Sequence, residues 1–294
     1  MAKLSVFNFI ISSLLLCSAL QLFKSISSDS IINIAILCLA NFFNFLILSM
    51  RPDKKPLILN DKKSNLCLLG WATGYVVVYF LYLYFPKNLH PSNIVLIKCI
   101  APTLALFFSN DWKLENLSPK ARIQSFLPLI LLFLIYVIER PSDQGHSTTN
   151  IILFLAILIS FVLSQTSTRV ISKSYKPFEL TRRVSLLISM LFLIMLLPQL
   201  QHIVNEFKVQ YFLYSFLLSL MIIMIQLFNI VGIQSSPPSL SALFMSSIVP
   251  ISLIWDFGMG NTSRGTVRIA LSALYCVLIW VKSRSKKNHK VFSS

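Results

Sequence analysis

Apolar stretches of about the length that crosses a bilayer recur along the whole chain. A hydrocarbon core of about 30 Å takes about 20 mostly apolar residues as a helix, and a helix satisfies its own backbone polar groups where no water is present. The sequence therefore predicts an all-α, polytopic membrane bundle of ten transmembrane helices. The predicted spans are Leu4–Phe23, Ile31–Met50, Asn65–Phe85, Ser92–Ser109, Ile123–Ile138, Asn150–Ile171, Val184–Leu200, Tyr211–Val231, Ser239–Trp255 and Thr266–Val281.

Composition excludes an ordinary water-facing domain. Hydrophobic residues make up 55% of the chain, charged residues only 12%, and the mean hydropathy is +0.74, so most of the surface is expected to face lipid. The segments between the spans are short and contain no Gly/Ser linker, which predicts a single bundle. For the first span there is an alternative, a secretory signal with Lys3 before the apolar core Leu14–Leu16.

The formal net charge of +16 acts as an orientation signal, because most Lys and Arg residues fall on one side of the predicted spans. They lie in residues 51–63, 113–122, 169–183 and 282–290. The third stretch places Arg182 and Arg183 in a loop, and few basic residues, such as Lys24 and Lys87, fall on the opposite side. The positive-inside rule then puts both termini in the cytoplasm, with a basic C-terminal tail, and nucleic acid is not an expected partner. The plasma (inner) membrane is the favoured location and an endomembrane the alternative.

An internal repeat is visible when the chain after Pro91 is compared with the chain after Pro238. Each copy has an apolar run with a further proline, a polar turn, and an arginine before the next predicted helix. The turns are Glu115–Ser118 and Gly260–Ser263. This order of features predicts two structural repeats of five spans each.

The two repeats are predicted to cover residues 1–140 and 141–294. Because five is odd, the second must be inverted relative to the first, and folds of this kind bind substrate near the midplane between repeats. Rocking of one half against the other would open that site to alternate sides. The sequence thus favours a secondary transporter or exchanger.

At Pro102 and Glu115–Ser118 the chain resembles the drug/metabolite transporter superfamily, in its EamA-like ten-span form. The resemblance implies ten spans, two five-helix halves and cytoplasmic termini. A narrower similarity joins Lys98–Pro102 to the Lys-x-x-x-Pro of the sugar-phosphate and nucleotide-sugar translocator branch, in which the lysine meets a phosphate. The Lys-Arg pair of that branch is missing from residues 243–247, and Asn261 stands where an acidic residue is usual.

Lys98 is the first candidate for a substrate contact, since it is the fully charged residue that lies well inside a predicted span. A charge in that position is costly unless something pairs with it, and an anionic group of a substrate would do so. The alternative is that its span begins later and the side chain reaches the outer interface.

The other candidates are polar side chains in apolar helices. The amides are Asn41, Asn44, Gln165, Gln226 and Asn229, and the aromatic residues are Tyr75 and Tyr79. Each amide either binds a ligand or bonds a neighbouring helix, and the tyrosines either line a cavity or pack. Gly70 and Gly74 have the small-x-x-x-small spacing that lets helix backbones approach closely.

The sequence offers no pattern for catalysis. The histidines His90, His146, His202 and His289 fall in predicted loops or tails without metal-ligand spacing, and there is no Gly-rich phosphate loop. We therefore expect no enzyme activity, cofactor or metal. The expected partners are a small polar or anionic metabolite and the lipid bilayer, with a homodimer as an alternative to a monomer. The competing functions are a membrane-embedded lipid-modifying enzyme and a non-transporting membrane partner protein.

Overall fold

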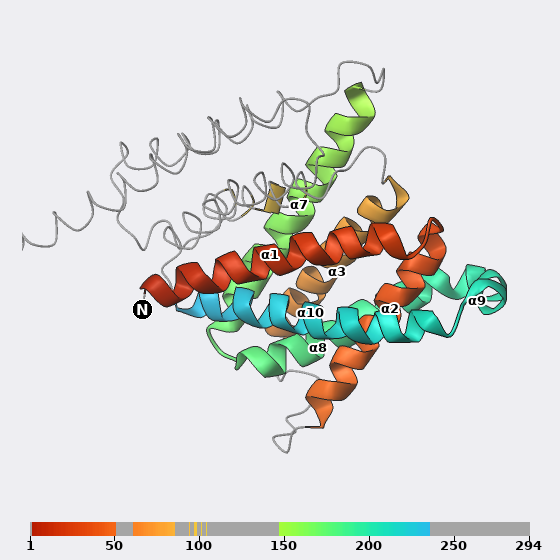
Figure 1. Cartoon of the computed structure of the whole chain (residues 1–294). Coiled ribbons are helices and arrows are strands. Elements are labelled where there is room, and N and C mark those ends of the chain that lie inside the picture. Colours follow the sequence, from red (N-terminus) through yellow and green to blue (C-terminus); the bar gives the residue numbers. More distant parts are fainter. Residues whose placement is uncertain are drawn as a thin grey trace, which may run out of the picture.

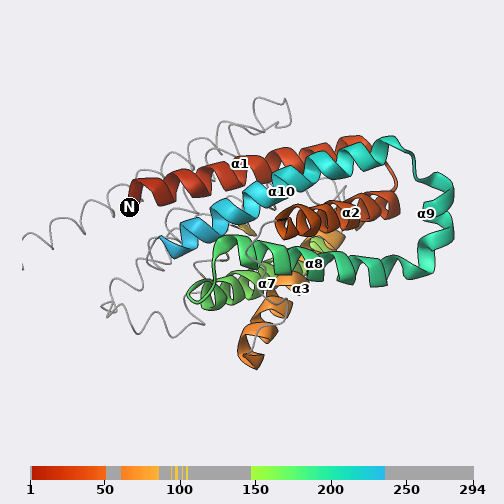
Figure 2. The ribbon, with the colours of Figure 1, turned by 90° about the horizontal axis from the view of Figure 1, so that it is seen from below.

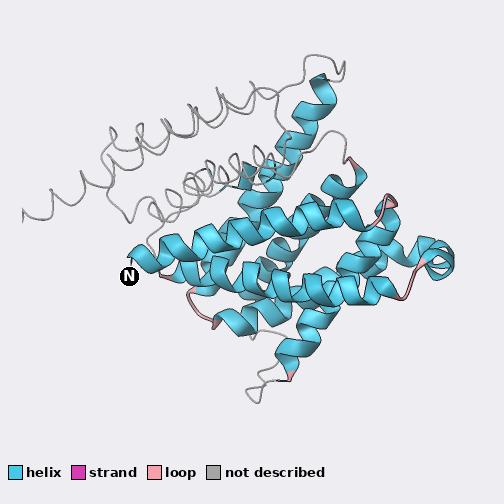
Figure 3. Cartoon of the chain, viewed as in Figure 1, coloured by secondary structure: helices cyan, strands magenta, loops and turns pink. Residues whose placement is uncertain are grey.

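The computed structural model describes residues 2–50, 61–85, 94, 97, 98, 101, 104 and 147–235. These residues form helices joined by short turns, and the described part of the chain contains no strand (Figure 3). The helices are α1 (Ala2–Ile26), α2 (Ser30–Ser49), α3 (Lys62–Tyr84), α7 (Ser147–Ser172), α8 (Pro177–Leu196), η1 (Leu197–Gln199), α9 (Leu200–Glu206) and α10 (Gln210–Gln234).

Five stretches of the described residues are helical, long and apolar enough to cross a membrane. They are Ser30–Ser49, Lys62–Tyr84, Ile152–Ser172, Pro177–Glu206 and Gln210–Gln234. The prediction of long apolar helices is therefore confirmed for these segments, and α1 adds the shorter apolar helix Phe7–Leu20. Three predicted spans, Ile123–Ile138, Ser239–Trp255 and Thr266–Val281, lie outside the described residues, as does most of Ser92–Ser109.

The first turns of α2 and α3 are fixed by aspartate caps. The Asp29 carboxylate accepts from the backbone N–H of Ile31 at 2.7 Å, and the Asp61 carboxylate accepts from the backbone N–H of Lys63 at 3.1 Å. These bonds satisfy donors that have no partner within the helix. Pro177 begins α8, where a missing N–H costs nothing.

The helices pack as antiparallel pairs (Figures 1 and 2): α1 with α10, α2 with α8, and α3 with α7. In the first pair, the Ser12 hydroxyl donates to the Ile225 carbonyl at 3.1 Å, and Gly232 lies against the Phe9 ring. In the last, Gly70 lies beside Ser167, one turn from the contact of Gly74 with Ser160. Each pair joins a helix from the first predicted half to one from the second.

One end of the bundle contains the α1–α2 turn, the last turn of α3, and α9; we call it the α9 end (Figure 1). The Ser30 hydroxyl donates to the Leu83 carbonyl at 2.8 Å there. Helices α1, α3 and α8 run toward this end, and α2, α7 and α10 run away from it. Corresponding helices of the two predicted halves therefore run in opposite directions.

Gly74 lets the backbones of α3 and α7 approach closely. A Cβ added to Gly74 would lie 2.5 Å from the Ser160 carbonyl oxygen, which is backbone, whereas one added to Gly70 would meet the Ser167 hydroxyl at 2.9 Å. The small-residue spacing seen in the sequence thus serves helix packing.

We expect Gly74→Ala to destabilise the protein by about 1–3 kcal/mol, because the added methyl group forces the two backbones apart. Gly70→Ala is the matched control: the Ser167 hydroxyl can rotate away, so its loss should be clearly smaller. Thermal unfolding of the purified chain in detergent measures both. Equal melting temperatures for the two variants would contradict this account of the α3–α7 contact.

Candidate functional site

A row of buried polar side chains lies where α2, α8 and α10 meet, and we call it the polar seam. Its members are Cys38 and Asn44 on α2, Ser185 and Ser189 on α8, and Ser219 and Gln226 on α10, which contact one another across the helices, together with the buried Asn41 and Asn229, which stand three residues from them on α2 and α10. All of them are surrounded by the apolar core of the bundle. Four of the eight candidate residues predicted from the sequence belong to this seam.

Direct contacts connect the three helices along the seam. The Cys38 thiol donates to the Ser189 carbonyl at 3.3 Å, which links α2 to α8. The Ser185 hydroxyl donates to the Gln226 side-chain carbonyl at 3.5 Å, which links α8 to α10. In the amide orientation that satisfies both of its polar atoms, Asn44 donates to the Ser219 carbonyl at 2.6 Å, which links α2 to α10.

Helical spacing explains why these residues share one region. Ser185 and Ser189 are four residues apart on α8, and Ser219 and Gln226 are seven apart on α10, so each pair falls on one helix face. On α2, Asn41 is three residues from both Cys38, which contacts α8, and Asn44, which contacts α10. Asn41 is therefore directed between those two helices.

Two amide oxygens of the seam stand out because they are buried without a hydrogen bond. Within the described residues, neither Asn41 Oδ1 nor Asn229 Oδ1 meets a donor, whereas the Asn41 amide nitrogen donates to the Leu37 carbonyl at 2.9 Å. Leaving such an acceptor unsatisfied costs about 1–3 kcal/mol. Both oxygens can accept hydrogen bonds from a polar ligand. The remaining predicted amide, Gln165, lies on α7 outside the seam.

Tyr75 and Tyr79 belong to a separate aromatic column on α3. Successive ring centroids lie 6.5 Å apart for Trp71–Tyr75 and 6.1 Å apart for Tyr75–Tyr79. The column continues to Phe23 of α1, which meets Tyr79 edge to face at 6.3 Å. All four rings are buried. The structure thus places the tyrosines together in one column, which reaches α1 through Tyr79.

Lys98 is helical and only 2% exposed. Its described neighbours along the chain, Ile94, Ile97 and Ala101, belong to the hydrophobic core. The lysine is therefore enclosed by the protein.

Sequence reasoning misplaced Arg182 and Arg183. Helix α8 begins at Pro177, seven residues before the predicted start, so both arginines are helical, and they are 6% and 3% exposed. Arg183 lies 4.0 Å from Glu179 and stacks over the Tyr175 ring at 5.3 Å. The four-residue spacing from glutamate to arginine was the signal that the helix already includes them.

Arg182 stands seven residues before Ser189 and therefore on nearly the same face of α8. This places a guanidinium at the end of the polar seam that is opposite the α9 end. The seam thus has a basic side chain at one end, which the sequence had assigned to a solvated loop.

Comparison with known proteins identifies the fold but no activity. No family model matches the chain, and no curated protein matches it. A solved structure described only as the crystal structure of a protein is similar to this chain, with a TM-score of 0.59 and 14% sequence identity. The alignment covers 94% of this chain and 93% of the chain in that structure. That likeness is one of fold. Among the described residues, no group of three His, Cys, Asp or Glu is arranged to hold a metal ion.

Proposed function

We propose that the chain is a secondary transporter or exchanger that binds a small polar metabolite at the polar seam and releases it by alternating access. The observation that carries this proposal is the pair of buried amide oxygens at Asn41 and Asn229, which meet no donor among the described residues. A helix bundle built only for stability gains nothing from such acceptors, because leucine would fill the space without the cost of desolvation.

The helix directions support an inverted repeat, which is the architecture that alternating access uses. Helices α1, α2 and α3 run opposite to α7, α8 and α10, taken in order. In this repeat α1 corresponds to α7, α2 to α8 and α3 to α10. Replacing each helix by its counterpart turns the α1–α10 pair into the α7–α3 pair and the α2–α8 pair into itself, and all of these pairs are in contact. In addition, α3 ends at the α9 end and α7 begins there, which supports an even number of crossings between them.

On this proposal the chain is a ten-span membrane protein with cytoplasmic termini, similar to the drug/metabolite transporter superfamily, in the plasma (inner) membrane or an endomembrane. The α9 end then faces away from the cytoplasm. The acceptor oxygens of the seam favour a substrate that carries hydrogen-bond donors, and the buried positive charges of Arg182 and Lys98 are compatible with a negative group on it.

Reconstitution tests the proposal directly. Purified protein is first screened by thermal shift with sugar phosphates, nucleotide sugars and amino acids, and the class that stabilises it is then used as a labelled substrate in liposome counterflow. We expect Gln226→Leu to reduce exchange at least about tenfold, the equivalent of about 1.4 kcal/mol. Gln165→Leu, an amide substitution outside the seam, should exchange at the rate of the unaltered chain.

Two results would reject transport at this site. One is exchange by Gln226→Leu at the unaltered rate. The other is the absence of both stabilisation and counterflow with every class in folded protein, which would leave the lipid-modifying enzyme or the non-transporting partner protein as the better account.

A further inference from the structure

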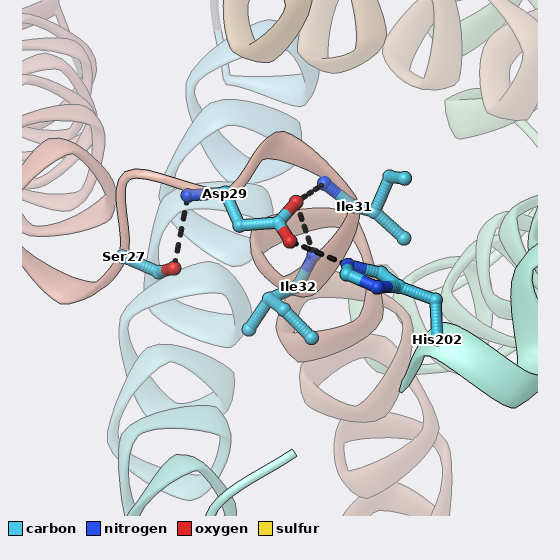
Figure 4. Close-up of polar contacts among 5 residues, drawn as sticks. All are labelled: Ser27, Asp29, Ile31, Ile32 and His202. Carbon is cyan, nitrogen blue, oxygen red and sulfur yellow. Dashed lines mark hydrogen bonds and ion pairs between the residues drawn. The ribbon is translucent and has the colours of Figure 1, made fainter. Parts of the chain in front are cut away.

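At the α9 end, one hydrogen bond joins the two predicted halves of the chain. The His202 Nε2 atom of α9 lies 2.6 Å from the Asp29 Oδ2 atom in the α1–α2 turn (Figure 4). The side chains are 41% and 33% exposed, respectively, so solvent protons reach both. We call this pair the latch.

Hydrogen bonds that do not involve His202 hold the Asp29 carboxylate in place. Asp29 Oδ1 accepts from the backbone N–H groups of Ile31 and Ile32 at 2.7 and 3.5 Å, which leaves Oδ2 for His202. The Asp29 N–H donates to the Ser27 hydroxyl at 3.0 Å, and the Asn33 amide donates to the Ser27 carbonyl at 2.8 Å. Asp29 therefore caps α2 and binds α9 at the same time.

Among the described residues, few apolar contacts hold helix α9. Leu200 and Val204 are largely exposed, and the helix is only seven residues long. Its packing partners are α2 and η1, with Ile203 partly buried against the core. A short helix held by few apolar contacts opens locally at low cost. The contact with Asp29 is thus well placed to decide whether α9 stays docked.

The strength of the Asp29–His202 contact depends on the protonation states of these two residues and not on other charges nearby. Burial raises the pKa of Asp29, but the hydrogen bond from His202 and those from the α2 backbone outweigh it and lower the pKa below its usual range. The other titratable groups near this end of the bundle are Lys24 on α1, Tyr84 at the end of α3, and Glu206, Lys208 and Tyr211 after His202, while α2 carries Cys38 farther along. Among these and His202, the charge that acts on Asp29 is that of His202.

We propose that the Asp29–His202 latch is a proton-binding site that holds the α9 end closed when the imidazole is protonated and the carboxylate is ionised. The inference goes beyond the proposed function, because the latch exists whether or not the chain carries a substrate. Histidine is the side chain that changes charge between about pH 5 and pH 8, and a charged donor strengthens a hydrogen bond to carboxylate roughly twofold.

The sign of the pH effect follows from both partners. A neutral imidazole binds a carboxylate more weakly than a protonated one, and histidine side chains in general lose their charge as the pH rises, so a higher pH weakens the latch. Because the pKa of Asp29 is lowered in the folded protein, the carboxylate contributes stability above its ordinary range and loses that contribution only as the pH falls through the lowered value. The latch is therefore tightest in mildly acidic solution.

Hydrogen–deuterium exchange of the full chain in lipid nanodiscs tests the latch without any substrate. After correction for intrinsic exchange rates, we expect the α9 amides of the unaltered chain to be at least about threefold better protected at about pH 6 than at about pH 8.5. Asp29→Asn keeps a side chain that can cap α2 but removes the charge, and His202→Gln keeps a donor but cannot be protonated. Both should show equal and low protection at the two pH values.

Glu206→Gln is the control, because it changes a charge on the same helix outside the latch and should keep the full pH response. Protection of α2 and α8 reports whether each variant is folded. A folded His202→Gln protein that keeps the pH response of α9 would overturn the proposal, as would an unaltered chain whose α9 protection is independent of pH. Neither outcome depends on whether transport is observed.

Discussion

Lys98→Gln is expected to lower metabolite exchange at least about tenfold while the protein remains folded. The side chain is enclosed in the core, where an ammonium interacts with an anionic group far more strongly than in water, and a tenfold change corresponds to about 1.4 kcal/mol. Liposome counterflow with the substrate class found by thermal shift measures the effect.

Lys98→Arg provides the control, since it keeps the charge but changes its shape. It should retain more exchange than Lys98→Gln if the negative group of the substrate is what the lysine recognises. Undiminished uptake by Lys98→Gln would remove this lysine from the substrate site.

Asn229→Leu is expected to lower exchange but not stability, and Asn44→Leu is expected to lower stability. The reason is that the Asn44 side chain bonds a neighbouring helix, whereas the Asn229 side-chain oxygen has no hydrogen bond among the described residues. Asn44 donates across to the Ser219 carbonyl, so its replacement should lower stability by about 1 kcal/mol. Asn229 Oδ1 meets no donor among the described residues, so leucine there should leave the melting temperature unchanged or raised while exchange falls severalfold.

Thermal unfolding and counterflow of the same preparations measure both quantities. If Asn229→Leu loses as much stability as Asn44→Leu and exchanges normally, Asn229 is a bond between helices and not part of a substrate site.

Sequence reasoning succeeded where one local pattern decides the structure. Long apolar runs located α1, α2, α3, α7, α8 and α10, because each such helix satisfies its own backbone whatever its neighbours are. The glycine spacing at Gly70 and Gly74 predicted close packing, and Asn41, Asn44, Gln226 and Asn229 were recognisable as polar groups in apolar helices.

The neighbours of each helix could not be read in this way. Nothing in the sequence says that α2 meets both α8 and α10, so the amides could not be joined to Ser185 and Ser189, whose type is common in helices. Serine is ambiguous because its hydroxyl often bonds its own backbone, as Ser160 does with the Ala156 carbonyl at 2.7 Å. The latch was missed for the same reason, since Asp29 and His202 are far apart in the chain.

The antiparallel pairing of helices has a consequence for how the molecule moves. Among the described residues, its most extensive contacts, α3 with α7, α2 with α8 and α1 with α10, all cross from one sequence half to the other, and at Gly74 the backbones of α3 and α7 lie too close together to leave room for a Cβ. In the proposed transport cycle, the pieces that shift would then be mixed units, each assembled from both halves, and not residues 1–140 against residues 141–294. Cutting the chain between those halves would yield fragments that need each other to fold.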